Sequence, residues 1–283
     1  MSRRSTGTPR EFFPRKRLGQ HFLVDKNARE KIVRVAALGP EDVVLEIGPG
    51  RGEMTECLAE RSRKVIAVEI DKILAERLVK TTASLGNVEV IHGDALKVDL
   101  EYLCHPFGGK LKVVANLPYQ ISTPLLMRFI RWRHLFTSLI LMLQKEVARR
   151  IVAKPGTKHY GVLSVLLQLY TTPTIEMVLP PDCFSPRPRV DSALVRFLLH
   201  ERPKEDVPDE ETFRRVVRAC FGHRRKRLKN ALRSILPEGY DAREIEGVMV
   251  NLGIDPGRRA ETLDLQEFAR LTAGLAPYMI SQG

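Results

Sequence analysis

The chain has 283 residues, of which 46 are Lys or Arg and 34 are Asp or Glu, so its formal net charge is +12. Hydrophobic residues make up 43% and charged residues 28%, which is typical of a folded globular protein and excludes a disordered chain or a fibre. No apolar run approaches the roughly 20 residues that cross a bilayer, and no apolar segment follows the basic N-terminus, so we expect neither a membrane span nor a secretory signal. The positive surplus predicts a polyanionic partner, either nucleic acid or an anionic membrane surface.

The four cysteines form no CxxC pair, and the seven histidines form no HExxH motif. Disulfide frameworks and zinc sites both need closer or patterned spacing. We therefore expect reduced thiols in a cytoplasmic protein that uses no metal.

The first segment, residues 1–17, contains six Lys or Arg residues and one acid, Glu11, among Ser, Thr, Gly and Pro. We predict a flexible basic arm, with RNA binding and a mere solubility role left as alternatives. A helix is predicted over residues 25–38, because its apolar residues share one face. Asp25 is the expected N-cap, and Gly39-Pro40 ends the helix.

Short apolar strands then alternate with helical segments. Strands are predicted at 43–47, 65–70, 88–92, 112–115, 139–143, 174–179 and 192–199, and helices at 53–60, 72–82, 124–131, 145–153 and 161–170. Buried strands separated by helices predict a parallel sheet that is covered on both faces. An acidic segment with two prolines, residues 201–211, is expected to be a linker, and helices are expected from about residue 212 onward.

A glycine-rich turn, Gly48-Pro49-Gly50-Arg51-Gly52, follows the first of these strands and precedes a helix. Glycine permits a tight turn and a close approach of a ligand to the backbone. The GxGxxG fingerprint of pyrophosphate sites is incomplete, because its third glycine is replaced by Glu53, whose carboxylate would repel a phosphate at a helix N-terminus. The spacing favours a ligand without phosphates, and S-adenosylmethionine is the obvious candidate.

Two acids follow the next two strands. Glu69 lies 19 residues after Gly50, where a carboxylate can accept hydrogen bonds from ribose hydroxyls. Asp94, in His92-Gly93-Asp94-Ala95, is expected to bind an adenine amino group. The carboxyl ends of parallel strands meet at one edge of a sheet, so the turn and both acids should line one site.

The tetrapeptide Asn116-Leu117-Pro118-Tyr119 follows the fourth strand of this series, at the same edge. The exocyclic amine of adenine is a poor nucleophile, because its lone pair is delocalised into the ring. An Asn oxygen and a carbonyl of a rigid Pro turn can accept both amine hydrogens and free that lone pair, while a Tyr ring stacks on a flipped-out base. Positioning and electrostatics then suffice for catalysis, without a strong general base.

These motifs resemble those of the KsgA family, the small-subunit ribosomal RNA adenine dimethyltransferases. The shared segments are LGQHFL at 18–23, EIGPGRG at 46–52, VEID at 68–71, GDA at 93–95, NLPYQIST at 116–123 and FSPRPRVDS at 184–192. The resemblance implies a Rossmann-like class I S-adenosylmethionine-dependent methyltransferase sheet, α/β and mostly parallel with seven strands, and a small C-terminal all-helical domain. The domains expected are the arm at 1–17, the catalytic domain at 18–204 and a helical RNA-binding domain at 205–283.

The resemblance also implies roles for single residues. Catalytic roles fall to Asn116, Leu117, Pro118, Tyr119 and Phe184, with Phe184 and Tyr119 expected to sandwich the target adenine. The predicted cofactor contacts are Gln20, His21, Leu23, Gly48, Gly50, Glu69, Asp94, Ala95 and Asn116. Members of the family convert two adjacent adenosines near the 3′ end of small-subunit rRNA to N6,N6-dimethyladenosine, in assembling subunits. We expect the same reaction here, by a monomer.

The excess positive charge is concentrated in two segments. Residues 212–237 contain nine Lys or Arg and no acid, and residues 1–17 carry a net +5, which leaves −2 for the rest of the chain. A run of one sign repels itself unless it binds a polyanion, and RNA phosphates relieve that repulsion by counterion release. The predicted RNA-binding residues are Arg224, Arg225, Lys226, Arg227 and Lys229.

Three alternatives remain. A resistance-type methyltransferase of large-subunit (23S) rRNA would share the chemistry, although such enzymes tend to carry Ile where this chain has Leu117. A non-catalytic ribosome-assembly or transcription factor would keep the fold for RNA binding, but the intact acids and tetrapeptide argue against it. A nicotinamide dehydrogenase is disfavoured by the missing third glycine.

Overall fold

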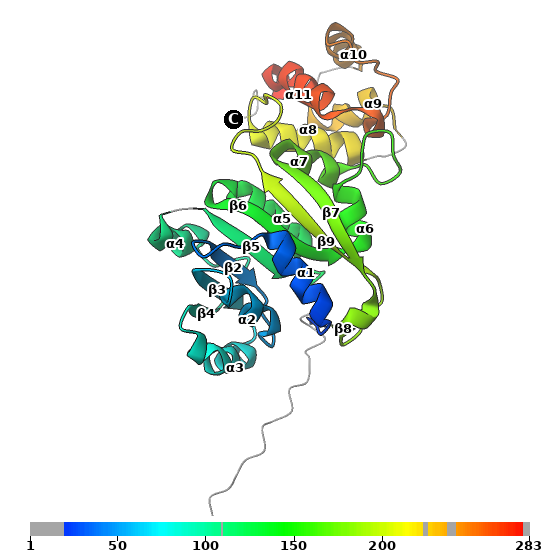
Figure 1. Cartoon of the computed structure of the whole chain (residues 1–283). Coiled ribbons are helices and arrows are strands. Elements are labelled where there is room, and N and C mark those ends of the chain that lie inside the picture. Colours follow the sequence, from blue (N-terminus) through cyan, green and yellow to red (C-terminus); the bar gives the residue numbers. More distant parts are fainter. Residues whose placement is uncertain (1–19, 109, 223–225, 237–241, 280–283) are drawn as a thin grey trace, which may run out of the picture.

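The computed structural model describes residues 20–108, 110–222, 226–236 and 242–279. The predicted arm at 1–17 and two predicted RNA contacts, Arg224 and Arg225, lie outside these residues. A seven-stranded sheet forms the centre of the molecule (Figure 1). Its strands lie in the order β4-β3-β2-β5-β6-β9-β7. Their bounds, in that order, are β4 (Val88–His92), β3 (Lys64–Glu69), β2 (Val43–Ile47), β5 (Leu111–Asn116), β6 (Phe136–Gln144), β9 (Ser192–Leu199) and β7 (Thr171–Leu179).

The sheet is mostly parallel, as predicted. Strands β4, β3, β2, β5 and β6 all pair in parallel, whereas β9 is antiparallel to both of its neighbours, β6 and β7. The bounds predicted for β2, β4 and β9 match residue for residue. Their apolar runs are short and sharply bounded, so the sequence defines their ends well.

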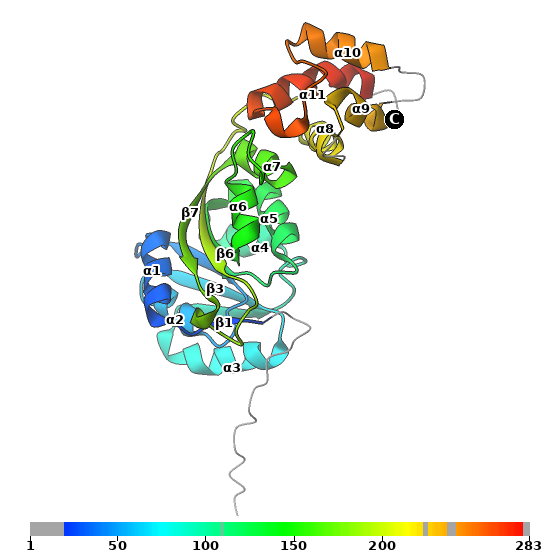
Figure 2. The same ribbon diagram turned by 90° about the vertical axis from the view of Figure 1, so that its right-hand side faces the viewer.

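Helices cover both faces of the sheet, because alternate residues of each buried strand face opposite sides. On β2, Val44 packs in a cluster with α1 and α2, while Leu45 packs in a second cluster with α4 to α7. Figure 2 shows these two helical layers on either side of the strands. One layer contains α1 (Lys26–Ala36), α2 (Glu53–Ala59) and α3 (Lys72–Thr82), and the other α4 (Leu100–Cys104), α5 (Ser122–Arg131), α6 (Lys145–Ile151) and α7 (Val162–Tyr170).

A second, very small sheet was not predicted. Strand β1 (Phe22–Leu23) pairs antiparallel with β8 (Phe184–Ser185), which lies in the connection between β7 and β9. The main chain extends this contact, because Val24 N donates to the carbonyl of Cys183 at 2.9 Å. Helix α1 follows directly, and Asp25 caps it as expected by accepting from Ala28 N at 2.7 Å. These contacts hold the N-terminal segment against residues 183–185, which lie more than 150 positions later in the chain.

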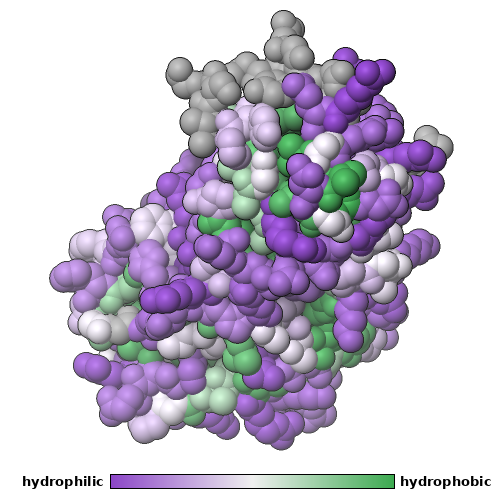
Figure 3. Space-filling model, turned by 90° about the horizontal axis from the view of Figure 1, so that it is seen from above, coloured by the Kyte–Doolittle hydropathy of each residue, from purple (hydrophilic) through white to green (hydrophobic). Residues whose placement is uncertain are grey.

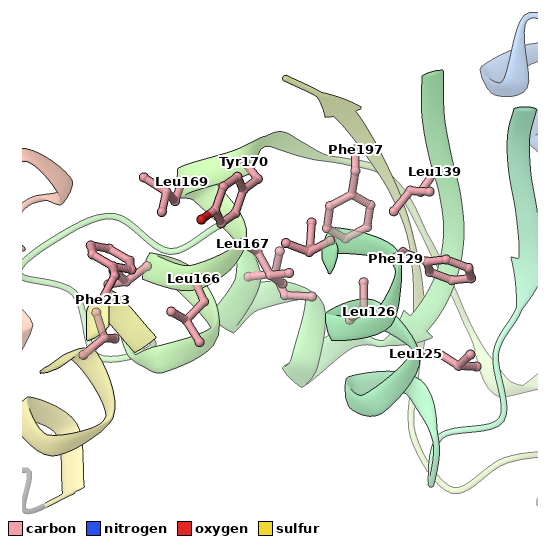
Figure 4. Close-up of a cluster of buried hydrophobic side chains, with 14 of the residues drawn as sticks. Leu125, Leu126, Phe129, Leu139, Leu166, Leu167, Leu169, Tyr170, Phe197 and Phe213 are labelled. Carbon is pink, nitrogen blue, oxygen red and sulfur yellow. The ribbon is translucent and has the colours of Figure 1, made fainter. Parts of the chain in front are cut away.

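The C-terminal segment is helical, as expected, and packs tightly on the sheet domain. It contains α8 (Glu210–Gly222), α9 (Leu228–Leu232), α10 (Ala242–Asn251) and α11 (Leu265–Met279), after a connection at 200–209 without helix or strand. Figure 4 shows one row of buried side chains that runs from Phe197 of β9 through Leu167 and Tyr170 of α7 to Phe213 of α8. Arg133 lies over the Tyr170 ring at 4.2 Å and pairs with Glu210 at 2.8 Å. The two parts therefore share one hydrophobic core.

The surface at the helical end of the molecule is largely hydrophilic, with small apolar areas between the polar side chains (Figure 3). Within the described residues, no helix combines the length and the apolar character that a membrane crossing requires.

The shared core leads to a prediction about stability. Replacement of Phe213, which is 1% exposed, by Ala should cost about 3–5 kcal/mol of unfolding free energy, because it leaves a cavity beneath α8. Calorimetry should show one transition in the parent and one, at lower temperature, in the variant. Val250→Ala on α10, where the side chain is 63% exposed, is the control and should change stability by less than about 0.5 kcal/mol. A separate early transition of the helical segment, with the sheet transition unmoved, would contradict a single core.

Candidate active site

A cavity opens at the carboxyl edge of the sheet, where the chain order reverses between β2 and β5. Ligands of open α/β sheets bind outside this point. The cavity holds about 720 Å³ of atom-free space, its open mouth included, a volume within the range of small-molecule sites. Its lining includes eight of the nine predicted cofactor contacts, namely Gln20, His21, Gly48, Gly50, Glu69, Asp94, Ala95 and Asn116.

The glycine-rich turn between β2 and α2 needs glycine for conformation and for packing. Gly48, Gly50 and Gly52 have φ angles of +69°, +60° and +93°, a region that other residues rarely adopt. A Cβ atom on Gly50 would lie 2.7 Å from the ring of Phe22. We expected a ligand to approach Gly50 closely, and the Phe22 ring does so as well. The sequence did not reveal this contact, because Phe22 lies 28 positions before Gly50 in the chain.

Glu69 ends β3 and braces this turn. It is 3% exposed, and its carboxylate accepts from Gly50 N at 3.1 Å and from Asp71 N at 2.9 Å. Burial raises the pKa of Glu69, while these two N–H groups act in the opposite direction. Each carboxylate oxygen still has a second lone pair, so Glu69 can accept from a ligand as well.

The loop after β4 carries Asp94 and Ala95. Asp94 accepts from Leu96 N at 2.9 Å, which holds its carboxylate against its own loop. Arg128 of α5 donates to the carbonyls of Leu96 and Val98. A guanidinium with several fixed donors can hold two carbonyls at once, so Arg128 clamps the segment that presents Asp94. The sequence showed no signal for this contact.

The tetrapeptide turn after β5 is fixed to the N-terminal segment. Asn116 Nδ2 donates to the main-chain carbonyl of His21 at 2.7 Å. This bond determines the orientation of the amide and leaves Oδ1 for another donor, because only the NH₂ end can donate to a carbonyl. Leu117 is 1% exposed and anchors the turn in the core. Pro118 and Tyr119 line the cavity beside Asn116.

The N-terminal segment is held in turn by the loop that contains β8. His21 Nδ1 lies 2.6 Å from the carbonyl of Pro186. Since a carbonyl only accepts, Nδ1 is the donor, and Nε2 of a neutral ring is left as an acceptor. The His21 and Tyr119 rings lie 5.8 Å apart at a tilt of 30°. One predicted contact, Leu23, does not line this cavity but a second one that adjoins it.

Phe184 is not placed as the predicted sandwich requires. Its side chain is 4% exposed and packs in the hydrophobic cluster with Leu23, Ile32 and Leu194. It is not among the residues that line the cavity beside Tyr119. The pairing of β1 with β8 explains this position, because Phe184 lies opposite Leu23 in the register.

Several cavity residues were missed because they are ordinary apolar strand residues. Ile47, Val68 and Ile121 contribute to the lining. Ile70 also lines the cavity, yet it is 47% exposed. An apolar residue directly after the acid that ends a strand is the one signal that could have indicated Ile70, since such a side chain can pack against a flat ring.

The adjoining cavity contains a buried carboxyl, Glu46, which is 3% exposed. Its Oε2 has no hydrogen-bond partner among the described residues. Burial raises its pKa to about 8, the nearby Thr55 hydroxyl acts in the opposite direction, and the nearby Glu69 and Glu53 add to the increase. Glu46 is therefore neutral at pH 7 in this arrangement.

The described part of the basic run presents both free and paired cations. Arg215, Arg218, Lys226 and Arg227 are exposed, and none of them pairs with an acid in the part of the chain that the structure describes. Lys229 instead pairs with Glu246 of α10, so an acid already offsets its charge. No group of three or more His, Cys, Asp or Glu side chains that could hold a metal occurs within residues 20–108, 110–222, 226–236 and 242–279.

The sheet order and the cavity at its carboxyl edge define the Rossmann-like class I fold of S-adenosylmethionine-dependent methyltransferases, with a helical C-terminal segment added. The chain belongs to the ribosomal RNA adenine dimethylase family, whose sequence model matches residues 12–271. It is 45% identical over 262 residues to the ribosomal RNA small subunit methyltransferase A of Geobacter metallireducens, covering 92% of this chain and 95% of that protein. The protein of the same name from Geobacillus kaustophilus is 47% identical over 267 residues, with 93% and 91% covered.

Solved structures agree with this assignment. A dimethyladenosine transferase from Plasmodium falciparum superimposes with a TM-score of 0.78 at 27% identity, covering 91% of this chain and 98% of that chain. The 23S rRNA methyltransferase ErmE superimposes with a TM-score of 0.69 at 25% identity, covering 90% and 99%. The fold is thus similar both to that of a dimethyladenosine transferase and to that of an enzyme named for 23S rRNA.

The buried carboxyl of Glu46 predicts a pH-dependent stability. The unfolded chain releases this proton near its ordinary pKa of 4.5, whereas the folded chain holds it to about 8. Stability therefore falls as the pH rises through this window, since the folded state binds the extra proton. Glu46→Gln should differ least from the parent near pH 5 and exceed its unfolding free energy at pH 9 by on the order of a few kcal/mol.

Thermal melts of both proteins between pH 5 and pH 9 measure this difference. The exposed Glu60→Gln, at the end of α2, serves as the matched control and should show no such trend. An equal difference between Glu46→Gln and the parent at pH 5 and pH 9 would mean that Glu46 ionises normally in the folded protein.

Proposed function

We propose that this chain transfers methyl groups from S-adenosylmethionine to the N6 amines of two adjacent adenosines near the 3′ end of small-subunit rRNA, forming N6,N6-dimethyladenosine. The observation that carries the proposal is the Asn116 amide, held by His21 so that its oxygen remains as an acceptor at the cavity wall. The names of the small-subunit relatives, at 45–47% identity over more than 90% of the chain, support the choice of rRNA.

The cavity suits S-adenosylmethionine because its polar groups are acids and acceptors, with Glu53 where a phosphate site needs glycine. In the complex, Glu69 would accept from the ribose hydroxyls, and Asp94 would accept from the adenine amine beside Ala95 and Ile70. Gln20, His21, Gly48 and Asn116 would hold the methionine end, with Leu23 supporting this wall from the adjoining cavity. When bound, the cofactor supplies a methyl group on a positively charged sulfur.

Two acceptors would hold the target amine. Asn116 Oδ1 is the first. The carbonyl of Pro118 already accepts from Ile121 N at 3.1 Å, and that of Tyr119 accepts from Ser122 Oγ at 3.0 Å. Each of these two carbonyls has one lone pair occupied, so we assign the second acceptor to the carbonyl of Leu117, which directly precedes the rigid proline. Both acceptors draw hydrogens away from N6 and restore its lone pair, which is catalysis by position and electrostatics.

The Tyr119 ring would stack on the flipped-out adenine. A sandwich with Phe184 stays a prediction, and it requires the Phe184 ring to leave the core in which it packs. Pocket shape must also admit a monomethylated amine, because four transfers complete the two adenosines.

The RNA surface is assigned to the basic run, through Lys226 and Arg227 and, outside the described residues, Arg224, Arg225 and the arm at 1–17. Lys229 is a weaker candidate because of its ion pair with Glu246. We place the domain boundary near residue 204, in the connection between β9 and α8, and expect a monomer that acts in the cytoplasm on assembling small subunits.

The first functional prediction concerns the reaction itself. Purified protein with S-adenosylmethionine and undermethylated small subunits should form N6,N6-dimethyladenosine in the small-subunit rRNA, measured by mass spectrometry of the nucleosides. Asn116→Ala should lower the rate by about two orders of magnitude or more, as loss of a preorganised polar group does, while cofactor binding is weakened but measurable. Near-normal turnover of this variant would refute the amine-orienting role, and transfer to large subunits alone would refute the substrate.

The second functional prediction concerns the affinity for small-subunit RNA. Lys226→Gln with Arg227→Gln should weaken binding to small subunits and reduce the slope of log affinity against log salt by about one to two, because each lost phosphate contact releases one counterion fewer. The control is Arg77→Gln with Lys80→Gln, an exposed pair on α3. An unchanged slope in the first double variant, or an equal loss in the control, would locate the RNA surface elsewhere.

A further inference from the structure

The hydroxyl of Tyr119 is anchored by a residue to which neither a catalytic role nor a cofactor contact has been assigned above. The hydroxyl of Tyr119 lies 2.8 Å from Oγ of Ser192. Ser192 is fully buried, with 0% exposure. Burial raises the pKa of the Tyr119 hydroxyl, while this bond acts in the opposite direction, so the phenol keeps its proton at neutral pH. The ring is therefore held at both ends, by its backbone in the tetrapeptide turn and by Ser192.

Ser192 is a rigid anchor because its main chain is fixed on both sides. It is the first residue of β9 and lies opposite Gln144 of β6 and Leu179 of β7. The preceding residue, Asp191, is fixed as well. Its carbonyl accepts from Lys145 N at 3.0 Å, and its carboxylate pairs with Lys145 Nζ at 2.8 Å. A hydroxyl on such a support restricts the tilt of the Tyr119 ring.

The two methyl transfers do not depend equally on that ring. In each transfer the amine nitrogen forms a bond to the methyl carbon, the carbon–sulfur bond breaks with its electron pair left on sulfur, and one amine proton passes to water. The unmodified amine has two hydrogens for the acceptors at Asn116 and Leu117. The monomethylated amine has one, so a larger share of its positioning must come from stacking on Tyr119.

We propose that Ser192 is a positioning residue that holds the Tyr119 ring against the target adenine and thereby allows the second methyl transfer to follow the first. This inference rests on the proposed function. It predicts that Ser192 affects the ratio of monomethyladenosine to dimethyladenosine among the products. A hydroxyl with only a structural role would not change this ratio. Loss of stability alone would slow both transfers by the same factor.

The test uses the full-length parent, Ser192→Ala, Tyr119→Phe and the double variant, each with undermethylated small subunits and saturating S-adenosylmethionine. The monomethyl and dimethyl products are counted by mass spectrometry at equal extents of first methylation. Removal of one hydrogen bond is expected to raise the monomethyl-to-dimethyl ratio about 3- to 10-fold in either single variant. The double variant should show no further increase, because both substitutions remove the same bond.

Ser164→Ala is the matched control, since Ser164 is also a fully buried serine whose hydroxyl is bonded, in its case to the carbonyl of Arg150. It should lower stability without changing the ratio. Ser192→Thr keeps the hydroxyl and should restore the parental ratio. Tyr119→Phe leaves β9 intact, so it keeps the proposal testable if Ser192→Ala folds poorly.

A parental ratio in Tyr119→Phe or in folded Ser192→Ala would overturn the proposal. So would effects that add in the double variant, because Ser192 would then act other than through the Tyr119 hydroxyl. These results leave the proposed function intact as long as the parent forms dimethyladenosine on small subunits. A parent that forms none overturns both.

Discussion

The hydrogen bond from Asn116 Nδ2 to the carbonyl of His21 is the contact on which the site depends. It determines which end of the amide is left to accept the target amine, and it requires the N-terminal segment to lie against the end of β5. That segment is held by pairing of β1 with β8 and by the bond from His21 to Pro186. Three segments that are remote in the chain must therefore assemble before the Asn116 oxygen is correctly oriented.

Charge is divided between the two tasks that the family membership requires. The carboxyl edge of the sheet contains buried acids, Glu46 and Glu69, whose pKa values burial raises. The described residues that line the cavity include carboxyls and amides but no Lys or Arg, so this edge suits a cofactor without phosphates and disfavours a polyanion. The basic surplus lies instead in the arm and in the run at 212–237, which together carry more than the total charge of +12. Within the described residues, none of the cations of the run at 212–237 lines the cofactor cavity.

The helices and strands could be predicted from the sequence, because their apolar residues follow regular patterns. The contacts that complete the site could not be predicted. The bounds of β2, β4, β9 and α3 follow from the sequence. Strands of two residues, such as β1 and β8, have no periodicity to detect. The partners of Asn116 and Tyr119 lie 95 and 73 positions away, so only the fold brings them together. For Phe184, the sequence motif suggested a contact with the target base. In the structure, the pairing of β1 with β8 buries its ring in the core.

The most direct test of the account is a map of N6,N6-dimethyladenosine in the rRNA of a strain that lacks the gene, compared with the parent strain and with the strain carrying the restored gene. The account predicts that both dimethylated adenosines near the 3′ end of the small-subunit rRNA disappear and return with the restored gene. Retention of both modifications in the deletion strain, or loss of methylation from large-subunit rRNA alone, would contradict it.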